Sequence, residues 1–368
     1  MSIVKELNSG WHLDHETFIN DIVDDLDLRS KPFFEIMVPF RMDLEAARVA
    51  REMTNAAPPG KVTSAMRKRE KKRNSRRAKK LEPHEERLES HRRNLFSELA
   101  HARLTPELVG DNNSKVRRLV AEIPGFEHPA PGDKLISFSN ESDEAKRLQL
   151  SGKSFIIPAR SRLLLGDIAE SIPLLVAERV KFEVIVMDPP WENKHVRREL
   201  ERGNGYAMET NDALFEKLKI PELLNRENGH LFIWCTNTPR HQEAVRNWID
   251  LWGLELRSTW YWLKVTKTGE TVCAMESVHK KPYEVIFLAS SKGNEVEAGF
   301  LRKEQLISSV PSGVQSVKPP LCQILSKIIP KFESMHCLEI FGRNLLPNWT
   351  TVGNECLRFQ DTFYFVEK

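Results

Sequence analysis

Apolar residues change their pattern along this chain of 368 residues near residue 150. From Ser161 onwards, short β-branched runs alternate with amphipathic stretches of helical length. This alternation predicts a doubly wound, Rossmann-like α/β sheet with one or two antiparallel strands. The expected strands are 162–165, 182–187, 229–235, 258–265, 283–289, 305–310 and 335–341, and the expected helices are 169–180, 211–224, 240–251 and 320–329.

The first 150 residues have weaker patterns, and they predict a mostly helical accessory region. Residues 32–40 are apolar enough to be buried, whereas 105–160 are punctuated by proline and glycine and read as a connection. We therefore expect an N-terminal accessory region over 1–150 and a second domain over 151–368. Helices are expected at 21–27, 41–53 and 83–104.

Charge and cysteine content narrow the class of protein. The net charge is only +3, so any affinity for nucleic acid must come from local patches such as residues 66–80. That run favours phosphate groups or nuclear-import receptors, although a solvated face that binds nothing is an equal alternative. The five cysteines form no CxxC pair, which favours free thiols in a reducing compartment and no metal site. With no secretory signal or membrane-spanning run, we expect a soluble protein of the nucleus, with the cytoplasm as a second location.

The most informative stretch is Phe182-Glu-Val-Ile-Val-Met-Asp-Pro-Pro-Trp191. Its β-branched half suits a parallel strand buried on both faces, and the two prolines must end that strand. Asp188 and Trp191 would then lie at the carboxyl end of a strand, where α/β sheets bind ligands. The alternative interpretation is a strand followed by a proline turn and a packed tryptophan.

This turn suits methyl transfer to a planar exocyclic amine such as that of adenine. The lone pair of such a nitrogen is delocalised into the ring, so the amine is a weak nucleophile. Asp188 and the Pro189 carbonyl can accept its two N–H groups, and charge-assisted hydrogen bonds contribute ~1.5–3 kcal/mol each. Pro190 stiffens the turn, and Trp191 is the expected platform on which the base stacks.

Two other strands are expected to end in polar groups. Leu163-Leu-Leu-Gly-Asp-Ile168 ends in an acid, and Met335-His-Cys-Leu-Glu-Ile-Phe-Gly-Arg343 ends in an aromatic residue, a glycine and an arginine. If these strands run parallel to the one before Asp188, all three endings share an edge that can hold a nucleoside-bearing cofactor. The chain has no Gly-x-Gly-x-x-Gly fingerprint and no Walker loop. S-adenosylmethionine has no phosphate groups to bind, and it therefore fits this edge.

The segments Asp-Pro-Pro-Trp-Glu-Asn-Lys194 and His-Lys-Lys-Pro-Tyr-Glu284 resemble those of a known family. They are similar to the eukaryotic N6-adenine methyltransferases with an Asp-Pro-Pro-Trp signature, relatives of the messenger-RNA adenine methylases, and to their methyltransferase-like protein four branch. The resemblance covers Leu163 to Lys368. It implies a class I methyltransferase sheet in circularly permuted (beta-class) order, in which the cofactor strand comes last. It also implies methyl transfer from S-adenosylmethionine to adenine N6 in nucleic acid.

The resemblance assigns roles to individual residues. On the cofactor side it implies contacts by Asp167, Ile168, Asp188, Lys318, Phe341, Arg343, Asn344, Asn354 and Glu355. Several relatives have Gln where Glu355 stands, which is a mild departure because either side chain can accept from a ribose hydroxyl. On the substrate side the expected contacts are Trp191, Asn193, Lys194, Tyr206, Lys281 and Glu284. The charged stretch 195–209 departs from the branch pattern, which leaves substrate preference open.

Other functions stay open. The chain is alternatively a catalytically silent nucleic-acid-binding subunit of a methyltransferase complex, or an enzyme for cytosine or protein amines. The branch resemblance implies either deoxyadenosine in DNA or 2′-O-methylated adenosine in small nuclear RNA. The adenine is expected in single-stranded or flipped form, because a stacked base is out of reach. Protein partners and oligomeric state do not follow from the sequence.

Overall fold

The computed structural model describes residues 3–40, 81–99, 101–126, 134–191, 211–277, 280–292, 303–314 and 316–368. Four predictions lie outside these residues: the helix 41–53, the basic segment 66–80, the contacts Asn193 and Lys194, and Tyr206. Among the described residues, none of the helices combines the length and apolar character needed to span a membrane.

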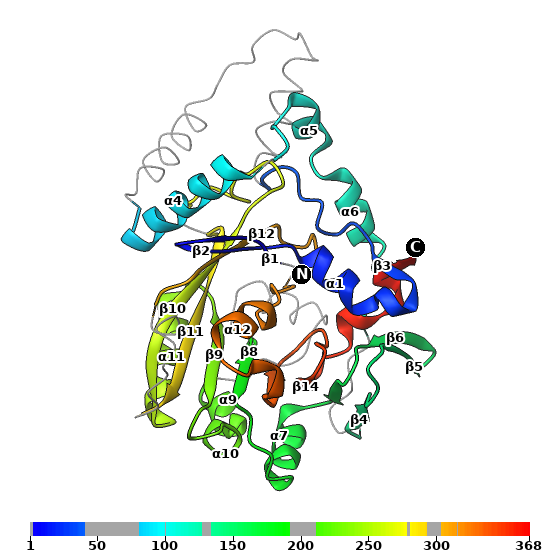
Figure 1. Cartoon of the computed structure of the whole chain (residues 1–368), viewed down its shortest axis with the longest axis vertical. Helices are drawn as coiled ribbons and strands as arrows, with labels where there is room; N and C mark the ends of the chain where they lie inside the picture. The colour runs from blue at the N-terminus through cyan, green and yellow to red at the C-terminus, as the bar shows by residue number, and fades with distance from the viewer. Residues whose placement is uncertain are drawn as a thin grey trace, which may run out of the picture.

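An 11-stranded sheet forms the centre of the molecule (Figure 1). Its order is β1 (Ile3–Leu7), β2 (Gly10–Leu13), β12 (Leu306–Ser309), β10 (Leu254–Lys264), β11 (Tyr283–Ser291), β9 (His230–Cys235), β8 (Val184–Met187), β13 (Cys337–Ile340), β14 (Trp349–Gly353), β7 (Arg162–Leu165) and β4 (Ile136–Ser139).

Five neighbouring strands, β9, β8, β13, β14 and β7, run parallel. Met187 at the end of β8 lies opposite Ile340 at the end of β13, and Gly353 at the end of β14 lies opposite Leu165. Their carboxyl ends therefore meet at one edge of the sheet. The segments that follow these strands are the ones for which ligand binding was predicted.

Helices cover both faces of the sheet and make a three-layer arrangement. Alternate residues of β8 explain the double cover, because Ile185 and Met187 pack on one face while Val184 and Val186 pack on the other. The first face is covered by α4 (Pro83–Glu98), α7 (Ile168–Ala177), α9 (Asn211–Leu218), α10 (Ile220–Leu223) and α11 (Pro239–Leu251). The second face is covered by α1 (His15–Val23) and α12 (Cys322–Ile328).

The structure corrects the predictions for the first 160 residues, which are mixed rather than mostly helical. The expected helix 21–27 is the end of α1 followed by the short 3-10 helix η1 (Asp24–Leu26). The stretch 105–160 is not a plain connection but contains regular elements. These are α5 (Pro106–Asp111), α6 (Ser114–Ala121), β4, and the hairpin of β5 (Lys146–Leu150) and β6 (Lys153–Ile157).

Elements from before residue 150 are part of the central architecture. β2 pairs with β12 at one end of the sheet, and β4 pairs with β7 at the other. A separate ladder joins β3 (Leu28–Ser30) to β15 (Phe365–Glu367). The accessory region thus contributes strands to the same sheet as residues 151–368.

Candidate active site

The Asp-Pro-Pro-Trp segment forms a tight turn directly after β8. The backbone N–H of Trp191 donates to the Pro189 carbonyl at 2.8 Å, which closes a three-residue turn. The backbone N–H of Asp188 donates to the Ile340 carbonyl at 3.4 Å, which ties the turn to β13. The Pro189 carbonyl was predicted as an acceptor for the target amine, and it keeps one lone pair after the bond to Trp191.

Trp191 is packed rather than open. It is 7% exposed, and its indole N–H donates to the Trp234 carbonyl at 3.0 Å. The ring stacks on His241 and Trp248 of α11, with centroids 5.2 and 5.6 Å away. The structure therefore does not place Trp191 as the open stacking platform that was predicted, because α11 takes up its ring. In this position it holds the turn in place.

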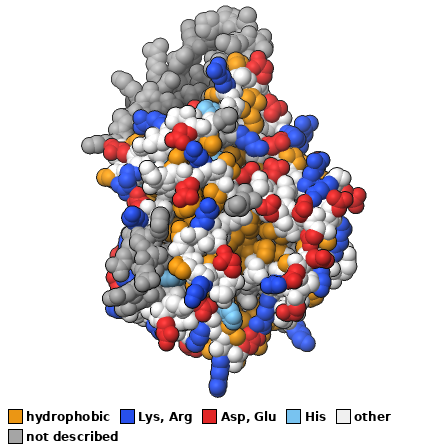
Figure 2. Space-filling model, viewed as in Figure 1, with side chains coloured by type: hydrophobic (Ala, Val, Ile, Leu, Met, Phe, Trp, Pro, Cys, Tyr) orange, Lys and Arg blue, Asp and Glu red, His pale blue; other side chains and the backbone are white. Residues whose placement is uncertain are grey.

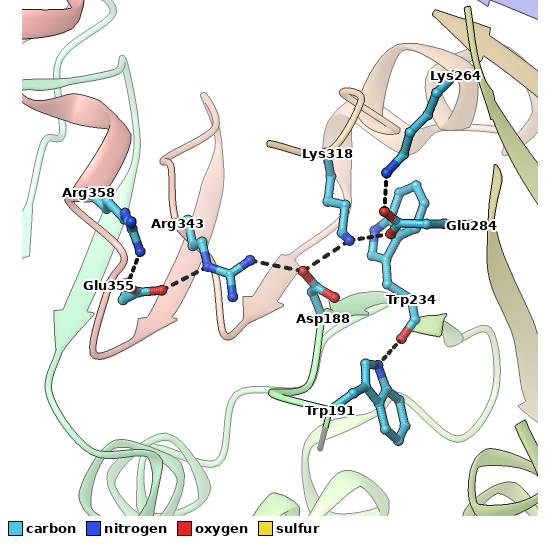
Figure 3. Close-up of polar contacts among 9 residues, drawn as sticks. All are labelled: Asp188, Trp191, Trp234, Lys264, Glu284, Lys318, Arg343, Glu355 and Arg358. Carbon is cyan, nitrogen blue, oxygen red and sulfur yellow. Dashed lines mark hydrogen bonds and ion pairs between the residues drawn. The ribbon is translucent and has the colours of Figure 1, made fainter. Parts of the chain in front are cut away.

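Asp188 lies at the centre of a row of alternating charges (Figure 3). Its Oδ2 atom is 3.2 Å from Arg343 Nη1 and 3.3 Å from Lys318 Nζ. Both ionic contacts of Asp188 thus fall on one carboxylate oxygen, and Oδ1 is left to accept from another donor. Asp188 and Arg343 therefore lie at the same edge of the sheet, as the expected strand order implies, and they contact each other directly.

The row continues on both sides of Asp188. On one side Arg343 Nε contacts Glu355 Oε2 at 2.8 Å, and Glu355 also pairs with Arg358 at 2.5 Å. Glu355 was predicted to accept from the ribose. The two arginines occupy both of its oxygens, although each oxygen keeps further lone-pair capacity.

On the other side, Lys318 pairs with Glu284 at 2.5 Å, and Glu284 also pairs with Lys264. Burial alone would raise the pKa of Glu284, but Lys264 and Lys318 outweigh it and hold the pKa well below its usual range. Burial would lower the pKa of Lys318, but Asp188 and Glu284 raise it above its ordinary value. Lys318 is therefore a permanent cation beside Asp188.

A partly enclosed cavity adjoins this row at Lys318. Lys318, Asn344 and Glu339 line it on the sheet side, and apolar residues of α1 such as Phe18 and Ile22 line it opposite. Figure 2 shows an apolar hollow on the face that carries α1 and α12. The cavity brings Lys318 and Asn344 together, as predicted for cofactor contacts, and it adds a wall from the N-terminal region.

Glu339 was not among the residues predicted for this site. Its Oε2 atom is buried and has no hydrogen-bond partner among the described residues. Burial and, next, the charge of Asp188 raise the pKa of Glu339 to about 8, although Arg343 lowers it. A signal was present in the sequence, because an acid interrupts the apolar run Cys337-Leu-Glu-Ile340 of a buried strand.

The turn after β13 needs its glycine. Phe341 adopts a left-handed backbone (φ +63°), an uncommon conformation that often occurs at functional sites. A Cβ on Gly342 would lie 2.3 Å from Thr351 Cγ2, so no larger residue fits there. This close approach brings Arg343 over the strand ends.

The remaining cofactor positions follow β7 and β14. Asp167 is exposed and accepts from the Ala169 N–H at 2.8 Å, so it caps α7. Ile168 is the first residue of that helix, and its side chain is buried. Asn354 follows Gly353, whose carbonyl accepts from the Gly166 N–H at 3.4 Å. Asp167, Ile168 and Asn354 therefore lie at neighbouring strand ends, as predicted, while their ligand contacts stay predictions.

Of the predicted substrate contacts within the described ranges, Lys281 and Glu284 are held by internal ion pairs. Lys281 Nζ is 2.5 Å from Glu85 Oε1, and its charge is used within the protein. No group of three or more His, Cys, Asp and Glu side chains in the described part of the chain is arranged to hold a metal ion.

Parallel strand ends, an acidic Pro-Pro turn and an adjoining cavity define an α/β domain of the nucleoside-binding type. Comparison with known families is more specific: residues 182–355 match the model of the MT-A70 family. MT-A70 methyltransferases use S-adenosylmethionine as their methyl donor.

Three relatives show how far the likeness extends. The chain is 37% identical over 237 residues to the N(6)-adenine-specific methyltransferase METTL4 of Homo sapiens, covering 62% of this chain and 48% of the relative. It is 35% identical over 213 residues to the N6-methyladenosine RNA methyltransferase MTA1 of Pyricularia oryzae (56% and 55%). It is 32% identical over 215 residues to the DNA N6-methyl methyltransferase of Caenorhabditis elegans (58% and 56%). The chain thus spans about half the length of the curated relatives it matches.

The residues at this edge fit S-adenosylmethionine. Glu339 Oε2, which has no hydrogen-bond partner among the described residues, is a buried acceptor, and the cofactor carries an ammonium group that can donate to it. Thr351 Oγ1, packed under Gly342, is a second buried polar atom without a partner among the described residues. Lys318 lines the cavity and supplies a cation for the carboxylate of the cofactor.

Proposed function

We propose that this protein transfers a methyl group from S-adenosylmethionine to the N6 amine of adenine in nucleic acid. The observation that carries the proposal is the position of Asp188, on a rigid Pro-Pro turn, fixed through one oxygen by Lys318 and Arg343. The MT-A70 segment and relatives named as N6-adenine methyltransferases support the same reaction.

The cofactor supplies an electrophilic methyl group when bound. The protein's part is to orient the target amine: Asp188 Oδ1 and the free lone pair of the Pro189 carbonyl accept its two N–H groups. These bonds direct the nitrogen lone pair out of the ring. Because Lys318 and Arg343 hold Oδ2, the acceptor geometry is set before the base arrives, and positioning of this kind supplies much of a rate acceleration.

We propose single-stranded or flipped adenine as the substrate form, since the acceptors lie at a sheet edge that a stacked base does not reach. The relatives carry names for both RNA and DNA methylation, so both polymers belong in the test. The sheet order, in which β13 and β14 separate β7 from β8, supports a circularly permuted methyltransferase fold carried by residues 151–368. The basic run 66–80 supports a nuclear location.

The test is methyl transfer by the purified protein from labelled S-adenosylmethionine to adenine-containing DNA and RNA oligonucleotides, including one with 2′-O-methyladenosine. We expect N6-methyladenine by mass spectrometry, and a loss of at least about 10²-fold in Asp188→Asn, because its amide carries no charge and presents one acceptor oxygen. Glu227→Gln, an exposed change outside the site, is the control.

No transfer to any oligonucleotide, together with saturable binding of nucleic acid, would instead indicate a catalytically silent binding subunit. Transfer to cytosine or to protein alone would refute the choice of adenine.

A further inference from the structure

Helix α4, from the N-terminal region, inserts a buried acid beside the start of β11. Glu85, in the first turn of α4, is 2% exposed. Its Oε1 atom lies 2.5 Å from Lys281 Nζ and accepts from the Tyr283 hydroxyl at 3.0 Å. Its Oε2 atom accepts from the Glu82 N–H at 3.0 Å, which completes the helix cap. Every recorded contact of this carboxylate is therefore with a donor.

The partners of Glu85 lead directly into the charged row around Asp188. Lys281, Tyr283 and Glu284 lie within four consecutive residues at the start of β11. Because side chains alternate along a strand, Tyr283 packs on the α4 side while Glu284 points to the opposite side. There Glu284 pairs with Lys318, which contacts Asp188. The start of β11 is thus fixed from both faces.

Neighbouring aromatic rings hold the same position. The imidazole of His84 stacks on Tyr261 with centroids 5.0 Å apart, and its Nε2 atom lies 2.8 Å from the Tyr283 hydroxyl. Lys281 is tied a second time, since its Nζ donates to the Met275 carbonyl at 2.7 Å. Burial would raise the pKa of Glu85, but hydrogen bonds from Lys281, Glu82 and Tyr283 hold it below its ordinary value. A charged, fully bonded acid at this point resists displacement.

We propose that Glu85 is a positioning residue for the active site: by holding Lys281 and Tyr283 it fixes the start of β11, so that Glu284 keeps Lys318 against Asp188. For its catalytic consequence this inference rests on the proposed function. It also assigns a role to α4, which lies outside the segment that matches MT-A70. Lys281 then serves as the partner of Glu85 rather than as a contact to phosphate.

The experiment compares Glu85→Gln with Glu86→Gln, an exposed residue of the same helical turn. Gln keeps the size of Glu85 and an acceptor for Tyr283, but it removes the charge opposite Lys281. We expect Glu85→Gln to lower kcat by about tenfold or more, with KM for the oligonucleotide and Kd for S-adenosylmethionine within about twofold of wild type. Glu86→Gln should match wild type.

Hydrogen exchange gives a readout that does not depend on activity. In Glu85→Gln the backbone amides of Lys281, Tyr283 and Glu284 and of residues 316–318 should exchange faster, and in Glu86→Gln they should not. If the wild type transfers no methyl group, the proposed function fails, whereas the exchange result still decides the positioning role. Unchanged exchange in both segments would overturn that role.

Two further variants guard against misfolding and against a merely structural role. Tyr283→Phe removes one hydroxyl and should lower kcat less than Glu85→Gln does. The double variant Glu85→Gln with Lys281→Met removes both charges and should recover at least about fivefold of the lost kcat, since no unpaired cation is left buried. A lower melting temperature with unchanged kcat would overturn the proposal. So would tighter oligonucleotide binding with unchanged kcat, because it would make Lys281 a substrate contact.

Discussion

Two carboxyl groups, Asp188 and Glu339, lie near each other at the ends of β8 and β13. They differ in how far neighbouring cations compensate their charge. Asp188 contacts two cations, whereas Glu339 has a buried oxygen without a described partner. When two acids lie close together in a buried site, one of them tends to be protonated. Here it is Glu339, whose pKa is raised. A cation bound at this site would favour the charged carboxylate of Glu339 over its protonated form.

Cofactor binding should therefore be linked to a proton. The pKa of Glu339 is raised to about 8, so below pH 8 the acid is mostly neutral, and a bound cation favours its carboxylate. Affinity for S-adenosylmethionine should rise with pH by up to about tenfold per unit below pH 8 and level off above it. Titration calorimetry in two buffers of different ionisation enthalpy measures the proton released.

The matched variant is Glu339→Gln, which cannot titrate and should show a flat profile. An affinity that is constant or falls between pH 6 and 8 in the wild type would contradict this linkage.

Single residues also show what the sequence could and could not reveal. Asp188 and Arg343 were predicted to meet because each follows a strand, and the carboxyl ends of parallel strands share an edge. The ion pair of Lys281 was not predictable, since its partner Glu85 is chosen by tertiary packing, whereas Arg358 lies only three residues after Glu355 and is a local partner. Function and packing compete for the same charges, and local sequence does not decide between them.

Among the elements, α11 most directly supports the catalytic turn. Its residues His241 and Trp248 lie two turns apart on one face, and both stack on Trp191. The prediction of an open Trp191 failed because the position of α11 over the strand end is a tertiary feature. The sequence Asp-Pro-Pro-Trp is the same whether the tryptophan is open or packed against a helix.

Trp191 should accordingly behave as a packed residue. Trp191→Ala should cost about 3–5 kcal/mol of unfolding free energy, as truncation of a buried tryptophan usually does. Trp191→Phe keeps the stacked ring and loses the bond to Trp234, for which we expect about 1 kcal/mol plus a smaller packing loss. Urea denaturation followed by fluorescence or circular dichroism measures both.

The control is Leu251→Ala, at the end of α11. Leu251 is 71% exposed, so this change should alter the free energy of unfolding by less than about 0.5 kcal/mol. If Trp191→Ala leaves stability intact and abolishes methylation, the residue is a base platform after all.

The predicted strands correspond to β7 to β13, whereas β14 and the strands before β7 were missed. β7, β8 and β9 have apolar runs that only a central strand explains. β14 went unrecognised because Trp349-Thr-Thr-Val-Gly353 is short and partly polar. β1 has the half-buried alternation of an edge strand and pairs with β2 in a local hairpin, but the place of this hairpin beside β12 depends on contacts distant in sequence.

At the scale of the whole molecule, N-terminal elements form both edges of the large sheet. β2 pairs with β12 and is followed by β1, and β4 pairs with β7 at the other edge. An uncovered strand presents free N–H and C=O groups to other chains and promotes aggregation.

A chain limited to residues 151–368 should therefore aggregate or stay partly unfolded, although it contains the complete MT-A70 segment. Size-exclusion chromatography and circular dichroism, with the full chain as reference, measure this outcome. A monomeric, cooperatively unfolding fragment would show that residues 1–150 are dispensable for folding.

The order of strands has a consequence for biosynthesis. β7 and β8 are made one after the other, yet β13 and β14 lie between them in the finished sheet. While the ribosome is still producing the residues between 188 and 336, β13 and β14 are not yet present beside β8, and Asp188 lacks its neighbours on that side. The sheet edge around Asp188 is complete only after residue 353 has left the exit tunnel, and contacts between residues so far apart in sequence form slowly.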